Sequence, residues 1–192
     1  MNNNDKKTVV LGVTSGIAAF KVSNLISLLR KDFNIRVVMT EDSTKLVSPV
    51  TFANLTQNPV LTDLWEASKD GVPAHIYLAD IASVLCIAPA TADILGKLAN
   101  GIADDALSTT AIAVGCPIVL APAMNHRMFN NPIVQANLQK LKDFGYYIIE
   151  PEEGWLACGH EAVGRLAEVE KIAKAIRKAI ASEIPPPSAP QH

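Results

Sequence analysis

The chain is 192 residues long, with 49% hydrophobic and 19% charged residues and a formal net charge of -2. A chain of this length and apolar content can bury one substantial core, and a second full domain is not expected. The small net charge excludes the basic field that attracts nucleic acid or anionic lipid, so the composition favours small-molecule chemistry.

The N-terminus and the cysteines bear on location and on cofactor class. Residues 1–7 are polar, and no apolar run reaches the roughly 20 residues that span a bilayer, so we expect a cytoplasmic protein. Cys86, Cys116 and Cys158 are odd in number and widely spaced, which argues against a disulfide scaffold or a zinc cluster. We expect Cys86 and Cys116 to be buried as small hydrophobic residues, and we expect no metal site.

Short apolar segments rich in Val and Ile predict buried strands at residues 8–13, 35–40, 84–89, 117–122 and 146–151. Helical patterns lie between and after them, at residues 17–31, 92–98, 132–144 and 168–181. Strands that alternate with helices predict a single-domain α/β fold, flavodoxin-like or Rossmann-like, with a doubly wound parallel sheet. We expect a disordered N-terminus over residues 1–6, the domain over 7–181, and a proline-rich tail or linker over 182–192.

Small and hydroxyl-bearing residues follow the first predicted strands, at the sheet edge where such folds bind ligands. Ser15 and Gly16 let backbone N–H groups approach a phosphate at a helix N-terminus, but the spacing matches neither common phosphate-binding motif, so an ordinary tight turn is equally consistent. Thr40, Ser43 and Thr91 follow later strands, where they either contact a cofactor or cap the next helix.

Asn125, Cys158 and His75 are the remaining candidates for chemistry. Asn125 follows the fourth predicted strand and carries a compact amide that can orient a carboxylate without adding charge, although this segment also reads as a Pro-rich turn packed by methionines. Cys158 lies in a Gly-flanked stretch rather than in a core strand. His75 starts an apolar segment, and a lone histidine is more often structural than catalytic.

Together these motifs resemble the homo-oligomeric flavin-containing cysteine decarboxylases, over about residues 7–180. The run from Pro122 to Asn125, followed by Met128, is similar to the family's PxMNxxMW pattern. The run from Leu156 to Gly159 is similar to its substrate-clamp motif. Within the family, the bacterial branch of coenzyme A synthesis is the most similar.

The resemblance implies FMN bound where subunits meet, in a homotrimer or in a dodecamer built from trimers. Flavin contacts would be Ser15, Gly16, Thr40, Ser43, Thr91 and Ala123. The catalytic residues would be His75, Cys158 and Asn125. Substrate contacts would be Met124, Asn125, Ala157 and Gly159. A phosphopantothenoylcysteine synthetase, fused or separate, would be the partner.

The implied reaction converts 4'-phosphopantothenoylcysteine to 4'-phosphopantetheine. Direct loss of carbon dioxide would leave an unstabilised carbanion, so the family's scheme first oxidises the substrate to a thioaldehyde, then releases carbon dioxide, then reduces the ene-thiol. Cys158 would donate the final proton, because a thiol with the ordinary pKa of about 8.5 is mostly protonated at neutral pH. His75 would assist the oxidation and decarboxylation.

Other functions remain open at this point. A peptidyl-cysteine decarboxylase would keep the same motifs and change the surrounding clamp, whereas a flavin prenyltransferase would have no need for the Asn125 and Cys158 motifs together. A flavin-binding regulatory subunit without turnover is the alternative from another class. Departures from the family pattern are Ser15 for a frequent Gly, Phe129 for Trp or Tyr, residues 93–94 for an Asn-Thr pair, and His160 for Asp.

Overall fold

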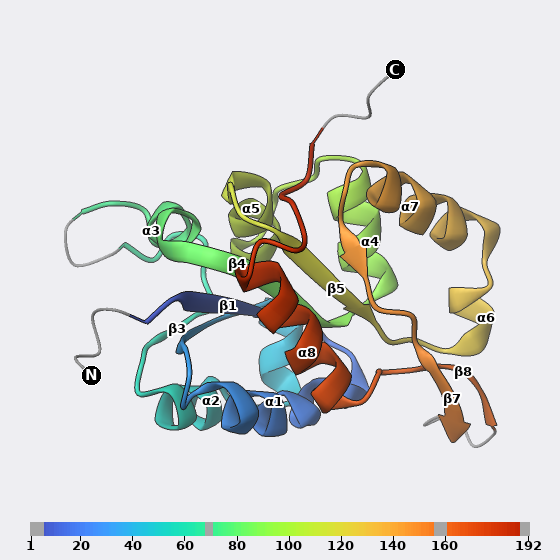
Figure 1. Cartoon of the computed structure of the whole chain (residues 1–192), viewed down its shortest axis with the longest axis horizontal. Helices are drawn as coiled ribbons and strands as arrows, with labels where there is room; N and C mark the ends of the chain where they lie inside the picture. The colour runs from blue at the N-terminus through green and yellow to red at the C-terminus, as the bar shows by residue number, and fades with distance from the viewer. Residues whose placement is uncertain (1–5, 68–70, 156–160, 189–192) are drawn as a thin grey trace.

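The structure, a computed structural model, describes residues 6–67, 71–155 and 161–188. Its centre is a six-stranded parallel sheet with the strand order β3-β2-β1-β4-β5-β6 (Figure 1). The order runs outward in both directions from β1 and β4, so the predicted doubly wound α/β fold is confirmed. The strands are β1 Thr8–Val13, β2 Asn34–Met39, β3 Val60–Leu61, β4 Ala82–Ala90, β5 Ile118–Pro122 and β6 Tyr147–Ile148.

Helices cover both faces of the sheet (Figure 1). One face packs on α1 Val22–Leu29, α2 Pro49–Thr56 and α8 Val169–Ile180. The other packs on α3 Ala74–Ile81, α4 Ala92–Ala99, α5 Ala106–Ala113 and α7 Pro132–Asp143. Shorter elements are the 3-10 helices η2 Ile17–Lys21 and η3 Glu41–Lys45, the helix α6 His126–Phe129, and the antiparallel pair β7 Glu152–Trp155 and β8 Glu161–Arg165.

Burial on both faces explains why the central strands are continuously apolar. All residues of β1 are buried, with Val9 and Leu11 in the core under one helical layer and Val10 in the core under the other. The surface helix α8 instead has one apolar and one polar face, because Ile172 and Ile176 are buried whereas its lysines are exposed.

The predicted elements agree with the structure at the sheet centre and differ at its edges. The first four predicted strands correspond to β1, β2, β4 and β5, and the predicted helices correspond to η2 with α1, α4, α7 and α8. The strand predicted over residues 146–151 is wrong in length, because β6 pairs only with β5 and Pro151, which lacks an N–H, follows closely. The prediction missed α2, β3, α3, α5 and the β7–β8 pair.

The strand order reverses between β1 and β4, which leaves a crevice beyond their carboxyl ends. The loop after β1 contains Ser15 and Gly16, and the loop after β4 contains Thr91. The backbone N–H of Ala123, at the end of β5, donates to the carbonyl of Ala90 over 3.1 Å. Three loops with predicted site residues therefore converge on one edge of the sheet.

The chain after α8 lies against the body of the domain as far as it is described. Ile184 is buried, and the backbone N–H of Ser188 donates to the carbonyl of Phe144 over 2.8 Å. The predicted domain limits stay a prediction. Within the described ranges, no helix combines the length and the apolar character that crossing a bilayer requires.

Candidate functional site

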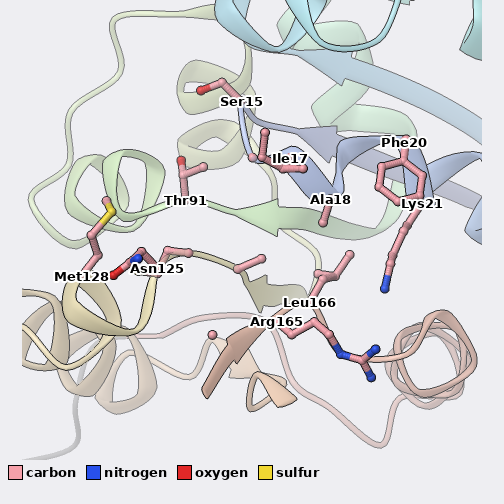
Figure 2. A pocket seen from close by; sticks show the side chains of 14 residues that line it. Ser15, Ile17, Ala18, Phe20, Lys21, Thr91, Asn125, Met128, Arg165 and Leu166 are labelled. Carbon is pink, nitrogen blue, oxygen red and sulfur yellow. The ribbon is translucent and has the colours of Figure 1, made fainter. Parts of the chain in front are cut away.

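Two adjoining cavities lie at the carboxyl edge of the sheet, with volumes of about 560 Å³ and about 240 Å³. They share Ser15 and Thr91, so together they follow the crevice between β1 and β4. The larger cavity, here called the substrate groove, is also lined by η2, by the loop from Ala123 to Asn125, and by the end of β8 (Figure 2). The smaller, here called the threonine cavity, is also lined by Thr40 and by charged residues.

The loop after β1 is tied to the loop after β4 through one buried hydroxyl. Thr14 Oγ1 donates to the carbonyl of Pro89 over 2.6 Å and accepts the N–H of Thr91 over 3.3 Å. Gly16 packs so closely that a Cβ there would lie 2.9 Å from Cγ of Pro89. The floor shared by both cavities is therefore held in place, with Ser15 exposed to the cavity space.

Thr40 presents an unsatisfied polar atom beside the threonine cavity. Its Oγ1 is buried and has no hydrogen-bond partner among the described residues, although buried hydroxyls are normally paired. Ser43 is fully buried behind it and donates from Oγ to the carbonyl of Thr40 over 2.7 Å. Thr40 thus lines the threonine cavity and carries a hydroxyl without a described partner, whereas Ser43 lines neither cavity and fixes the backbone of Thr40.

Asn125 lines the substrate groove at the start of α6. Its Oδ1 accepts the backbone N–H of Arg127 over 2.8 Å, which caps this short helix and fixes the amide plane. Figure 2 shows Asn125 beside Met128 at one end of the groove. A fixed amide in a mainly apolar groove can orient an anionic group through its N–H donors.

The β7–β8 pair is fastened to the loop that carries Asn125. The backbone N–H of Met124 donates to the carbonyl of Gly164 over 3.0 Å. Gly164 has a φ of 137°, and a Cβ there would collide with the carbonyl oxygen of Met124. Only glycine allows β8 to approach this closely, so the hairpin and the Asn125 loop form one structural unit.

Ion pairs hold the base of this hairpin. Arg165 pairs with Glu152 over 3.1 Å and with Glu168 over 2.5 Å. Partial burial would raise the pKa of Glu152, but hydrogen bonds from the backbone of Glu168 and from the side chains of Arg165 and Lys171 outweigh it and lower the pKa below its ordinary value. Glu152 is therefore ionised at neutral pH and balances the charge of Arg165.

A second charge cluster borders the threonine cavity. The Lys97 amino group lies 2.7 Å from Asp105 and 2.8 Å from Asp104, with Asp93 at 3.7 Å. Burial would lower the pKa of Lys97, but its hydrogen bonds to Asp104 and Asp105 raise it above the ordinary value. Asp105 also caps α5 through the N–H of Ser108, so this cluster joins α4 to α5.

Some predicted residues lie elsewhere or outside the described ranges. His75 sits in α3, before β4 begins, and lines neither cavity; its Nδ1 is buried without a hydrogen-bond partner among the described residues. Ala157, Cys158 and Gly159 lie outside the described residues, in the sequence between β7 and β8. Their roles and that of His75 stay predictions.

The other two cysteines are buried, as predicted. Burial raises the pKa of Cys86 to about 12 and that of Cys116 to about 11, so both remain protonated thiols in the core. Among the described residues, no group of three His, Cys, Asp or Glu side chains is arranged to hold a metal ion.

Sequence reasoning assigned no role to Lys21, Gly164 or Arg165, which the structure brings to the substrate groove. Lys21 ends η2, so its distance from the first strand concealed its place at the edge of the sheet. Gly164 and Arg165 arrive on a hairpin that the sequence did not predict. A Gly-Arg pair just after the predicted clamp motif was the available signal.

The parallel sheet is doubly wound, and glycine and hydroxyl-bearing residues line its edge where the strand order reverses. These features define the class of α/β proteins that bind a phosphate-bearing cofactor at that edge. Within this class, the chain belongs to the flavoprotein family, whose model matches residues 1–181.

Relatives of known name agree with this assignment. The chain is 45% identical over 189 residues to the coenzyme A biosynthesis bifunctional protein CoaBC of Bacillus subtilis (strain 168), covering 98% of this chain and 47% of the relative. It is 37% identical to a probable phosphopantothenoylcysteine decarboxylase of Streptococcus mutans, covering 90% and 98%. The chain therefore spans about half the length of the bifunctional relative and nearly all of the second.

Solved structures are similar over most of the chain. A PPC decarboxylase mutant complexed with pantothenoylaminoethenethiol superposes with a TM-score of 0.83 and 31% identity, covering 90% of this chain and 97% of that one. The FMN-dependent cysteine decarboxylase SpaF superposes with a TM-score of 0.81 and 38% identity, covering 91% and 95%.

Proposed function

We propose that this chain catalyses the FMN-dependent decarboxylation of 4'-phosphopantothenoylcysteine to 4'-phosphopantetheine. The observation that supports the proposal is the junction of the two cavities at Ser15 and Thr91, because the amide of Asn125, fixed by its hydrogen bond with Arg127, lines the larger of them. The name of the full-length Streptococcus relative and the ligand of the PPC decarboxylase structure support the substrate.

The residues that line the two cavities are of the types that bind a flavin nucleotide. Ser15 and Gly16 provide the small turn at the switch point, and Thr91 provides the facing loop. Thr40 Oγ1, buried without a partner among the described residues, is a hydrogen-bonding group that a ligand would satisfy. FMN held by these residues would supply a reversible two-electron acceptor for the oxidation of the substrate and for the reduction that follows the loss of carbon dioxide.

The protein's own residues then bind the substrate and handle the proton. Asn125 donates to the substrate carboxylate and holds it without a charge that would stabilise it against departure. Cys158 donates the proton that accompanies the returning hydride, since a neutral thiol is a better acid than water at neutral pH. In the sequence, Cys158 lies between the two strands of the β7–β8 hairpin. The hydrogen bond from Met124 to Gly164 fastens this hairpin to the loop that carries Asn125. This contact supports a single site that contains Cys158 and Asn125.

We also propose a homo-oligomer, a trimer or a trimer-based dodecamer, in which α3 of a neighbouring subunit completes the groove. His75 lines neither cavity of its own chain, which supports its delivery by a partner. Large apolar side chains are exposed near the groove and near α3. Phe20 is 58% exposed at the groove, and Trp65, which precedes α3 in the sequence, is 87% exposed. Such surfaces are typical of contacts between subunits.

The bifunctional relative supports a further proposal about the pathway partner. The partner that we propose is a phosphopantothenoylcysteine synthetase, fused or separate, and its support is that this chain matches only about half of a relative whose name describes it as bifunctional. The location that we propose is the cytoplasm.

The proposal is tested by giving the purified, FMN-loaded protein 4'-phosphopantothenoylcysteine and, separately, a peptide with a C-terminal cysteine. We expect carbon dioxide and 4'-phosphopantetheine from the first substrate and little product from the second. Preferential turnover of the peptide would identify a peptidyl-cysteine decarboxylase. Stable FMN binding without carbon dioxide from either would instead indicate a regulatory flavoprotein.

Two variants separate the proposed half-reactions. Cys158→Ser keeps the size of the side chain but removes the acidic thiol, so under anaerobic conditions it should release carbon dioxide, lose flavin absorbance and accumulate the ene-thiol. Asn125→Asp places a carboxylate against the carboxylate of the substrate, so neither gas nor bleaching should appear. Normal production of phosphopantetheine by Cys158→Ser would show that the thiol is not the proton donor.

A further inference from the structure

The substrate groove has an uneven distribution of charge along its length. Among the described residues of its lining, Lys21 and Arg165 are basic, and Asn125 is at the other end in the view of Figure 2. Between them the wall is mainly apolar, with Ile17, Phe20 and Leu166. The groove therefore has a neutral amide at one end and cations at the other.

The two cations differ in how far they are already neutralised. Arg165 is paired with Glu152 and Glu168. No described carboxylate pairs with the Lys21 amino group, although the side chain is partly buried. In Figure 2 the Lys21 side chain extends from η2 toward the end of β8, where Arg165 lies. Lys21 thus supplies the uncompensated positive charge of the groove.

The proposed substrate has a matching arrangement of charge. It carries a carboxylate at its cysteine end and, at the far end of an uncharged pantothenoyl chain, a phosphate with a charge of about -1.5 to -2 at neutral pH. If Asn125 takes the carboxylate, the phosphate must lie away from it, toward the other end of the groove. A phosphate bound there meets an ammonium group that attracts it as a point charge.

On the basis of the proposed function, we infer that Lys21 binds the 4'-phosphate of the substrate and makes the enzyme selective for the phosphorylated form. The phosphate of FMN is the other candidate for this charge. In the proposed function the cofactor lies on the floor at Ser15 and Thr91, which both cavities share, whereas Lys21 ends η2 and lies apart from Ser15 and Thr91 in Figure 2. The two phosphates therefore have separate positions.

The inference is tested with 4'-phosphopantothenoylcysteine and with pantothenoylcysteine that lacks the phosphate. Lys21→Met removes the charge and keeps the length of the stem, and Lys21→Arg keeps the charge. The selectivity, kcat/KM for the phosphorylated over the unphosphorylated substrate, should fall about tenfold to a hundredfold in Lys21→Met, mainly through KM, because a hydrogen bond to a charged group is lost. Lys21→Arg should recover part of this selectivity.

Controls distinguish the possible failures. Lys174→Met removes an equal charge from the exposed face of α8 and should keep the wild-type selectivity. Unchanged selectivity in Lys21→Met, or loss of bound FMN from that variant, would overturn the inference, the latter by assigning Lys21 to the cofactor phosphate. Absence of decarboxylation in the wild-type protein would instead refute the proposed function itself.

Discussion

Two threonine hydroxyls in the described part of the chain, those of Thr40 and Thr109, are buried without hydrogen-bond partners. Leaving such a group unpaired costs about 1–3 kcal/mol. Thr40 lines a cavity, so a ligand can pair its hydroxyl, whereas Thr109 lies in α5 and lines neither cavity of the site. The two residues therefore form a natural pair for testing whether the threonine cavity binds the flavin.

Thr40→Val should weaken the binding of FMN while leaving the fold intact. The substitution removes a hydroxyl and keeps the shape, so a lost hydrogen bond of about 0.5–1.5 kcal/mol should raise the Kd for FMN about two- to tenfold. Thr109→Val makes the same chemical change away from the cavities and should leave the Kd unchanged. Fluorescence titration of the apoprotein measures both values, and equal affinities for all three proteins would contradict a flavin contact at Thr40.

The residues of the site differ in how far the sequence could reveal them. Ser15, Gly16 and Thr91 could be predicted at one edge because each directly follows a strand, and parallel strands end together. Lys21 and Arg165 could not be predicted at this edge. They line the same groove only because η2 and a hairpin far along the chain fold over the edge. Distance in sequence and the absence of a strand signal concealed them.

The β7–β8 hairpin is the element that connects the sheet edge to the predicted clamp. Its β8 strand accepts the N–H of Met124, and Arg165 anchors its base near the start of α8. The close approach depends on Gly164, as its positive φ and its contact with the Met124 carbonyl show. We therefore expect substitutions at this glycine to lower the decarboxylase activity more than they weaken the binding of FMN.

Gly164→Ala should move the hairpin away from the Asn125 loop. The added Cβ meets the Met124 carbonyl and takes on a φ that L residues rarely adopt, a strain of about 1–3 kcal/mol. We expect kcat/KM for decarboxylation to fall at least about tenfold, since substrate-binding groups would be misplaced, while FMN stays bound. Gly115→Ala is the matched control, because nothing lies within 4 Å of a Cβ at that position. Equal activity of the two variants would show that the hairpin position is unimportant.

At the scale of elements, the fold was predictable where the hydrophobic pattern is regular. The central strands are apolar throughout, and α4, α7 and α8 combine apolar with polar faces. By contrast, α5 has the sequence ALSTTAIA, in which even Ser108 and Thr110 are buried, so no polar face marks a helical period. The strand β3 has two residues, too few for a pattern.

At the scale of the whole molecule, the proposed site combines the substrate groove with α3, the helix that carries His75. α3 precedes β4 and packs near α5, whereas the groove lies beyond the carboxyl end of β4. Asn125 lines this groove, whereas His75 lines neither cavity. We therefore propose that His75 reaches the groove from a second subunit of a symmetric oligomer.

Mixed oligomers test this arrangement directly. His75→Asn and Asn125→Asp chains, each expected to be inactive alone, would be co-expressed with different affinity tags, and assemblies containing both would be purified through the two tags in turn. If every site takes Asn125 from one subunit and His75 from another, about a third of the sites in a mixed trimer, or about a quarter in a randomly assembled dodecamer, carry both wild-type residues, so about that fraction of the wild-type kcat should return. If both residues came from one chain, no site in the mixture would be intact. Mixed oligomers that bind FMN and release no more carbon dioxide than their parents would therefore place the whole site within a single subunit.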